Sequence, residues 1–196
     1  MAEITIDAIK KLKELSGVGL TDAKKALVEA NGDFDKALKA MREKGLTKAE
    51  KRGDRETREG IIASYVHDNR LGAIVEVNCE TSFVANTDEF KELAHKLAMQ
   101  IASMNPLYVS EADIPEAAYN EKAAEFEANF KGPENMKEQI IEGQIKKAFA
   151  DKVLMLQPYI LDDSKTVAEF IKEMIAKTGE NITVRQFKRI ELGVNE

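Results

Sequence analysis

The chain has 196 residues, 43% of them hydrophobic and 33% charged, and its formal net charge is −6. These values are typical of one or two globular domains with a charged surface. The acidic balance argues against nucleic acid as a direct partner, because binding to phosphates relies on Lys and Arg. No apolar run approaches the roughly 20 residues that span a bilayer, so no membrane contact is expected. The lone cysteine, Cys79, fits a reducing, cytoplasmic compartment.

Residues 1–45 predict an N-terminal domain of three short helices. In the first helix an apolar stripe recurs every three positions, at Ile6, Ile9, Leu12 and Leu15. Gly17 and Gly19 end that helix, and Thr21 stands where the N-cap of the second helix is expected. The apolar faces expected for the second and third helices are Ala23, Ala26, Leu27 and Ala30, and Phe34, Ala37, Leu38 and Met41.

Residues 46–60 are expected to link this domain to the rest of the chain. The stretch from 42 to 60, REKGLTKAEKRGDRETREG, has few large apolar residues and many charges of both signs. One interpretation is a solvated tether, and the other is an electrostatic contact with a partner or with RNA. We favour the tether, because charges of mixed sign cancel the field that nucleic-acid binding requires.

Residues 61–196 predict an α+β core domain. GIIASYVH and GAIVEVNCE are rich in β-branched residues and are joined by a polar turn, which indicates a β-hairpin. A helix over 88–104 follows, with Asp88 as its cap and an apolar face formed by Phe90, Leu93, Leu97, Ile101 and Met104. Residues 116–155, interrupted by a Gly-Pro pair, predict a projecting helical hairpin. A helix from Ser164 to Lys177 and a closing strand, ITVRQFKRIEL, complete the domain.

The sequence carries no pattern typical of an enzyme. His67 and His95 lack metal-type spacing, one cysteine cannot form a C-x-x-C pair, and there is no H-E-x-x-H. A Walker A motif and a G-x-G-x-x-G motif are also missing. Cys79 ends an apolar stretch and is interpreted as a buried small hydrophobe. We therefore expect no catalysis, no cofactor and no bound metal, with histidines that are structural or solvated.

Several segments carry, in chain order, a resemblance to a known family: GVGLTDAKKALVEANGD, NCETSFVAN, LAMQIASMNP, EGQIKKAF with LQPYI, and GENITVRQFKRIELG. Together they resemble the translation elongation factor Ts family. The resemblance implies a three-helix N-terminal domain similar to ubiquitin-associated domains, then a small antiparallel sheet packed with helices and carrying a helical hairpin. Longer members contain the core unit twice. This chain has room for one, so it is similar to the short members, which are expected to form homodimers. Some of these have a cysteine near position 188, where this chain has Lys188.

The resemblance also implies a function. Such a protein is a guanine-nucleotide exchange factor that binds elongation factor Tu, disturbs its Mg²⁺ site and promotes GDP release during translation elongation, without covalent chemistry. Two segments match the family's docking segment and its Mg²⁺-site segment: Leu20, Thr21 and Lys24, and Thr81, Ser82, Phe83 and Val84. Phe83 is expected to act as a wedge on a short loop, and Ser82 replaces the usual aspartate.

Without the resemblance, the same residues have plainer interpretations. Phe83 would be a core residue, since phenylalanine is usually buried. Lys24 would be a solvated lysine, and Thr21 only an N-cap. Two other functions stay open: an adaptor whose three-helix domain binds ubiquitin-like or nascent-chain partners, and an unrecognised enzyme. An adaptor of that kind has no need for the NCETSFV segment outside its helical domain.

Overall fold

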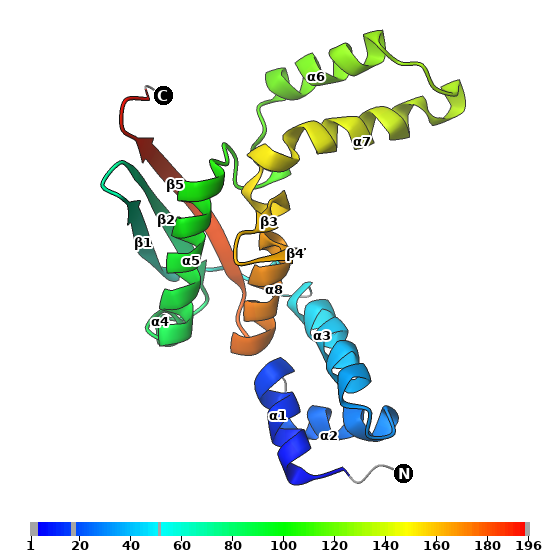
Figure 1. The fold of residues 1–196 in the computed structure, drawn as a ribbon, viewed down its shortest axis with the longest axis vertical. Helices are drawn as coiled ribbons and strands as arrows, with labels where there is room; N and C mark the ends of the chain where they lie inside the picture. Colours follow the sequence, from blue (N-terminus) through cyan, green and yellow to red (C-terminus); the bar gives the residue numbers. More distant parts are fainter. Residues whose placement is uncertain (1–3, 17–18, 51, 195–196) are drawn as a thin grey trace. The chain divides into compact units, whose positions relative to one another are not determined.

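A computed structural model describes residues 4–16, 19–50 and 52–194 (Figure 1). Its class is α+β, as predicted, with helices accompanying a three-stranded and a two-stranded sheet. The contacts divide the chain into two compact units. The first contains Met1–Ala63, Glu76–Ala94 and Glu169–Val184, and the second contains Ser64–Val75, His95–Ala168 and Arg185–Glu196. The domain boundaries at residues 45 and 60 stay a prediction. None of the helices in the described ranges has the length and apolar character to cross a membrane.

Helices α1 (Ile6–Ser16), α2 (Leu20–Glu29) and α3 (Phe34–Glu50) form the predicted N-terminal three-helix arrangement. Their buried core is Ile9, Leu12, Ala23, Ala26, Leu27, Ala30, Ala37 and Met41. The stripe predicted for α1 is only half buried, because Ile6 is 71% exposed and Leu15 is 51% exposed. A step of three residues advances about 300° around a helix, so a stripe with this spacing winds through about 180° between its ends. Only its middle faces the core.

The start of α2 differs from the prediction. Gly19 occupies the N-cap position without a side-chain hydrogen bond, so the helix begins at Leu20 and Thr21 lies inside its first turn. Thr21 is therefore not the N-cap, because its own backbone is already helical. The end of α2 is set by Asn31 and Gly32, which have φ of 54° and 83°, left-handed values that end a helix.

The segment predicted as a linker, 46–60, is partly helical and partly bound through its backbone. Helix α3 continues to Glu50, which places the first part of the linker in a helix. In the second part, the buried amide of Asn181 donates hydrogen bonds to the carbonyl oxygens of Gly53 at 3.1 Å and Arg55 at 2.8 Å. Residues 53–56 are nevertheless exposed, so this part of the segment is solvated and is held through its backbone. The mixed-charge sequence does not reveal which of its carbonyls will meet a buried donor, and the linker itself stays a prediction.

Strands β1 (Glu59–His67), β2 (Leu71–Cys79) and β5 (Ile182–Glu191) form the larger sheet in the order β1-β2-β5. This confirms the predicted hairpin and closing strand. The turn between β1 and β2 is tight, with left-handed φ of 48° at Asp68 and 56° at Asn69, as hairpin turns require. Alternate residues of β2 are buried, as a strand with one face in the core demands: Ala73, Val75, Val77 and Cys79.

Helix α4 (Ser82–Ala85) is a single turn, and α5 (Asp88–Met104) has the predicted bounds. The predicted apolar face of α5 is buried except at its last residue, Met104, which is 39% exposed. The cap of α5 is Thr87 and not Asp88: the Phe90 N–H donates to Thr87 Oγ1 at 3.3 Å. Asp88 is already the first residue of the helix, one position too late to cap it.

Helices α6 (Glu116–Ala128) and α7 (Lys137–Phe149) form the predicted helical hairpin (Figure 1). Short 3₁₀ turns lie beside these helices, at Glu111–Asp113, Glu134–Met136, Ala150–Lys152 and Leu154–Leu156. The hairpin's buried seam is narrow, and its members come from α7 and the residues just after it: Ile141, Ile145, Phe149 and Val153.

A small second sheet precedes the last helix, and the sequence did not reveal it. Strands β3 (Pro158–Tyr159) and β4 (Asp162–Thr166) pair antiparallel, and α8 (Val167–Thr178) follows. The helix predicted from Ser164 therefore begins later. Ser164 donates its backbone N–H and its hydroxyl to Asp162 Oδ1, and such a local turn competes with helix formation.

Gly60 in β1 generates a stability prediction. A Cβ at this position would overlap the carbonyl oxygen of Val77 and would lie 2.7 Å from the Asn78 Cα, both of them backbone atoms. We expect Gly60→Ala to lower the free energy of unfolding by about 1–3 kcal/mol, the usual cost of overpacking. Circular dichroism melting curves measure the change.

Gly143 on α7 is the matched control, because a Cβ there would meet no atom within 4 Å. Gly143→Ala is expected to stabilise the protein by roughly 0.5–1 kcal/mol, since alanine is the better helix former. Equal shifts of the melting temperature for the two variants would contradict this account of the sheet.

Candidate functional site

Helix α4 presents an aromatic side chain to solvent. Phe83 is 82% exposed, whereas the next two residues, Val84 and Ala85, are buried at 6% and 4% exposure. Consecutive helical residues point about 100° apart, so anchoring these two directs Phe83 outward. The core interpretation of Phe83 is therefore wrong. The expected loop is a one-turn helix, and Ser82 lies exposed at its first position.

A single carboxylate holds the residue before this helix. Oε2 of Glu180 accepts the backbone N–H groups of Glu80 at 3.1 Å and Thr81 at 3.0 Å, and Oε1 accepts the Thr81 hydroxyl at 2.6 Å. Thr81 is also the N-cap of α4, because its Oγ1 accepts the Val84 N–H at 3.4 Å. Hydrogen bonds to a charged acceptor are stronger than those between neutral groups, so this contact defines the backbone where α4 begins.

The contact is reciprocal. While Glu180 binds the backbone at residues 80 and 81, Oε1 of Glu80 accepts the backbone N–H of Asn181 at 2.6 Å. Arg55 Nη1 lies 3.4 Å from the same oxygen of Glu80 and forms an ion pair with it. The end of β2, the segment before β5 and the second half of the linker therefore meet around Glu80 and Asn181.

Cys79 lies beneath this contact. Its side chain is fully buried, and the thiol donates to the carbonyl oxygen of Thr81 at 3.2 Å. Burial raises the pKa of the Cys79 thiol above its usual value, and the nearby charge of Glu180 raises it further. The predicted role as a buried small hydrophobe is confirmed, and the neutral thiol is not prepared for nucleophilic chemistry.

The second candidate segment lies at the start of α2. Leu20 is 53% exposed, and Thr21 and Lys24 are also exposed. Leu20 and Lys24 are four positions apart, so they share one face of the helix. This face offers an apolar side chain and an ammonium group together, which suits contact with another protein.

The two histidines meet at one tyrosine. The Tyr65 hydroxyl and His67 Nδ1 are hydrogen-bonded at 3.0 Å, and the ring of His95 packs edge-on against Tyr65 at 5.8 Å between centroids. Their separation along the sequence gave no sign of this. Within the described ranges, no group of three or more His, Cys, Asp and Glu side chains is placed to hold a metal ion.

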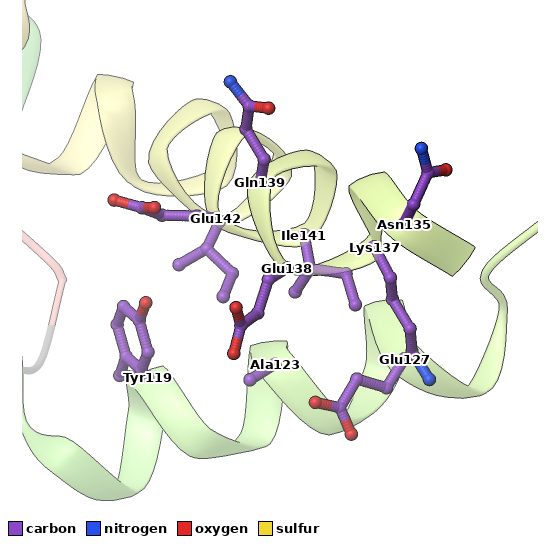
Figure 2. Close-up of a pocket in the computed structure, with 10 residues that line it drawn as sticks. Tyr119, Ala123, Glu127, Asn135, Lys137, Glu138, Gln139, Ile141 and Glu142 are labelled. Carbon is purple, nitrogen blue, oxygen red and sulfur yellow. The ribbon is translucent and has the colours of Figure 1, made fainter. Parts of the chain in front are cut away.

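A groove of about 800 Å³ lies between α6 and α7. Figure 2 shows Tyr119 and Ala123 of α6 facing Ile141 of α7, with Glu138 beside them. The carboxylates of Glu127, Glu138 and Glu142 on its rim are exposed to water. Exposed acids lack the desolvation that prepares a carboxyl group for catalysis. The groove is therefore interpreted as the packing seam between α6 and α7. The better candidate site is the Phe83 turn, which comprises Thr81 and helix α4 (Ser82–Ala85).

Two residues that organise the site escaped the sequence analysis, Glu180 and Asn181. From the sequence, both residues were expected only in the connection between the last helix and the closing strand. The signal that could have found them is the segment GENITV, which is one of those that carry the family resemblance and which contains both residues. A polar pair in front of an apolar strand is otherwise unremarkable.

Comparisons with known proteins agree on one family. The family model described as Elongation factor TS matches residues 7–194. Elongation factor Ts of Thermotoga maritima is 52% identical over 193 residues, which cover 97% of each chain. Elongation factor Ts of Thermoanaerobacter pseudethanolicus is 46% identical over 194 residues, covering 97% of this chain and 95% of the relative. That of Rippkaea orientalis is 49% identical over 198 residues, covering 98% of this chain and 80% of the relative.

These matches first define a class: the chain is a translation elongation factor. More particularly, it belongs to the elongation factor Ts family. Membership implies the role of nucleotide-exchange factor for elongation factor Tu, which is exercised by binding and not by covalent catalysis.

The buried thiol of Cys79 yields a labelling prediction. Because the chain has one cysteine, any reaction with a thiol reagent reports on this residue alone. We expect Ellman's reagent at neutral pH to react on the order of 100-fold more slowly with the native protein than with the chain in denaturant, since attack requires local opening and a thiolate. Equal rates in the two states would show that the segment around Cys79 is open.

Proposed function

We propose that this chain acts in the cytoplasm by docking on elongation factor Tu, disturbing its Mg²⁺ site and so promoting GDP release. It does so by protein contacts alone, with no cofactor and no direct contact with nucleic acid or membrane. The observation that carries the proposal is the 82% exposure of Phe83 on a turn held by Glu180. An exposed phenylalanine lacks the favourable free energy of burial in the free protein, and a partner that covers the ring provides that free energy on binding.

The residues of the Phe83 turn have different roles in this proposal. The ring of Phe83 enters the partner near its Mg²⁺ site. Ser82 is exposed beside it, and its hydroxyl offers a hydrogen bond without the charge of the usual aspartate. Thr81 already donates to Glu180, and Val84 is buried, so these two hold the wedge in place.

The start of α2 supplies the docking contact. Leu20 contributes exposed apolar surface, and Lys24 contributes a positive charge on the same helix face. Thr21 lies exposed between them and offers a hydroxyl. Contacts of this kind strengthen the complex whether or not nucleotide has left, so they set affinity and not the rate of release.

Linkage constrains how such a factor works. If its binding lowers the affinity of the partner for nucleotide, nucleotide must lower the affinity of the partner for the factor by the same ratio. The factor therefore prefers the empty partner. Interactions made only when the Mg²⁺ site is disturbed accelerate release, and the Phe83 ring is the proposed source of these interactions.

The exchange assay tests the wedge. Elongation factor Tu is loaded with fluorescent GDP, and the loss of signal is followed after this protein is added. Burying an aromatic ring is worth about 2–3 kcal/mol, so losing about 2 kcal/mol should slow stimulated release on the order of 30-fold. We expect this loss for Phe83→Ala at saturating factor, with the melting temperature nearly unchanged.

Lys24→Glu is the contrasting variant. It should raise the concentration of factor needed for half-maximal release while leaving the maximal rate intact, and its own stability should change by less than about 0.5 kcal/mol. A Phe83→Ala protein that is folded and releases GDP at the wild-type rate would exclude the wedge. Wild-type protein that fails to stimulate release at all would exclude the proposed function.

We also propose a two-fold homodimer formed through the larger sheet and its closing strand. Exposed apolar residues lie on β1, β2 and β5 and just after β5: Val66, Ile74, Ile190, Leu192 and Val194. Apolar side chains exposed on a sheet mark an interface, and two-fold pairs are the commonest oligomers. Lys188 stands where some short relatives have a cysteine, and Cys79 is buried, so the pair forms without a disulfide.

The dimer should therefore depend on concentration. Light scattering coupled to size-exclusion chromatography is expected to show a shift from monomer to dimer as the concentration rises through the micromolar range. Ile190→Asp places a charge in the proposed interface and should favour the monomer. Wild-type protein that is only monomeric at high micromolar concentration would refute the dimer.

A further inference from the structure

The direction of the Phe83 ring depends on the backbone of α4. At 82% exposure, the ring has little contact with the rest of the chain to hold it. Helix α4 has four residues, far fewer than the dozen or so that an isolated helix needs to be stable in water. Whatever fixes the backbone of α4 therefore fixes where the ring points.

Burial anchors Val84 and Ala85 at the end of this helix, and the carboxylate of Glu180 fixes the residue directly before its start. It binds both the N–H and the hydroxyl of Thr81, at 3.0 Å and 2.6 Å, and Thr81 then accepts the N–H of Val84 at 3.4 Å. These bonds run from Glu180 to the residue two positions before Phe83 and on to the residue directly after it. The polar contacts therefore hold the backbone on both sides of Phe83 in the sequence and leave the ring exposed.

We propose that Glu180 is a positioning residue, whose carboxylate holds Thr81 and thereby sets the direction in which Phe83 meets its partner. The inference rests on the proposed function, because the direction of the ring matters only if the ring is the wedge. Glu180 lies 99 positions from Thr81 along the chain, in the turn before β5. It acts through Thr81.

A carboxylate suits this position, because both of its oxygens accept hydrogen bonds and both carry charge. Three donor hydrogens converge on its two oxygens, two from backbone N–H groups and one from the Thr81 hydroxyl. A glutamine side chain has the same shape but replaces one acceptor oxygen with an NH₂ group, which is itself a donor. With Glu180→Gln, both backbone N–H groups must share the single amide oxygen and the Thr81 hydroxyl must change from donor to acceptor, and the charge is removed from all three contacts.

The first test is a double-mutant cycle on the rate of stimulated GDP release at saturating factor. Glu180→Gln is expected to slow release on the order of 10-fold, the size expected for losing hydrogen bonds to a charged group. In a Phe83→Ala background the same change should have no further effect, because no ring is left to position. Glu142→Gln, an equivalent change at an exposed site on the helical hairpin, is the matched control and should have no effect.

The second test separates positioning from a general loss of stability. The chain has no tryptophan, so Phe83→Trp introduces a single fluorophore at the wedge. Adding Glu180→Gln should lower the fluorescence anisotropy of this reporter in the free protein, well below the melting temperature. If Glu180→Gln does not fold, Glu180→Asp decides the matter: it keeps the charge but shortens the side chain by one methylene, and it should lower the anisotropy in the same direction.

The outcomes distinguish this inference from the proposed function. If wild-type protein does not stimulate release, the proposed function fails, and if folded Phe83→Ala releases GDP at the wild-type rate, the wedge and the inference fail together while the exchange function stands. If Phe83→Ala is slow but folded Glu180→Gln is as fast as wild type with unchanged reporter anisotropy, only the positioning role of Glu180 fails. Equal slowing by Glu180→Gln with and without the Phe83 ring would also overturn it, because the effect would then be general.

Discussion

The exposed site depends on reciprocal hydrogen bonds between two glutamate carboxylates and the backbone. Glu180 accepts the backbone N–H groups of residues 80 and 81, and Glu80 accepts the backbone N–H of Asn181 at 2.6 Å. Each carboxylate thus binds the backbone beside the other. These hydrogen bonds join the end of β2 to the segment before β5. The side-chain amide of Asn181 adds hydrogen bonds to the carbonyl oxygens of Gly53 and Arg55. Without the carboxylate of Glu180, the start of α4 would lose these hydrogen bonds, and the burial of Val84 and Ala85 would be left to hold this single helical turn.

A polar contact suits this task better than packing does. A side chain held by packing is buried, and a buried ring cannot enter a partner. Hydrogen bonds to the backbone around Phe83 hold the turn while the ring stays in water. Below the ring, Val84 and Cys79 supply the buried apolar surface that packing requires. In the proposed function, a ring mounted in this way loses little conformational freedom on binding, so more of the free energy of its burial is available to disturb the Mg²⁺ site of the partner.

The elements predicted correctly from the sequence are those in which apolar residues recur regularly over many positions. The bounds of α5 were correct because its apolar residues follow the helical repeat over seventeen residues. The β-hairpin was correct because alternation and turn chemistry agree. The half-exposed stripe of α1 was missed because a spacing of three does not match 3.6 residues per turn. For the candidate site, the resemblance drew attention to Phe83 as a presented wedge, but the bond between Glu180 and Thr81 spans 99 positions, and no local pattern contains it.

The proposed mechanism requires that the Phe83 ring is exposed to solvent in the free protein and becomes covered when the nucleotide-free partner binds. The most direct measurement is acrylamide quenching of the Phe83→Trp reporter, alone and in complex with elongation factor Tu, before and after GDP is added. The account predicts that the reporter is strongly quenched in the free protein, shielded in the nucleotide-free complex, and quenched again once GDP dissociates the pair. A reporter that stays equally accessible to acrylamide in a fully formed nucleotide-free complex would contradict the claim.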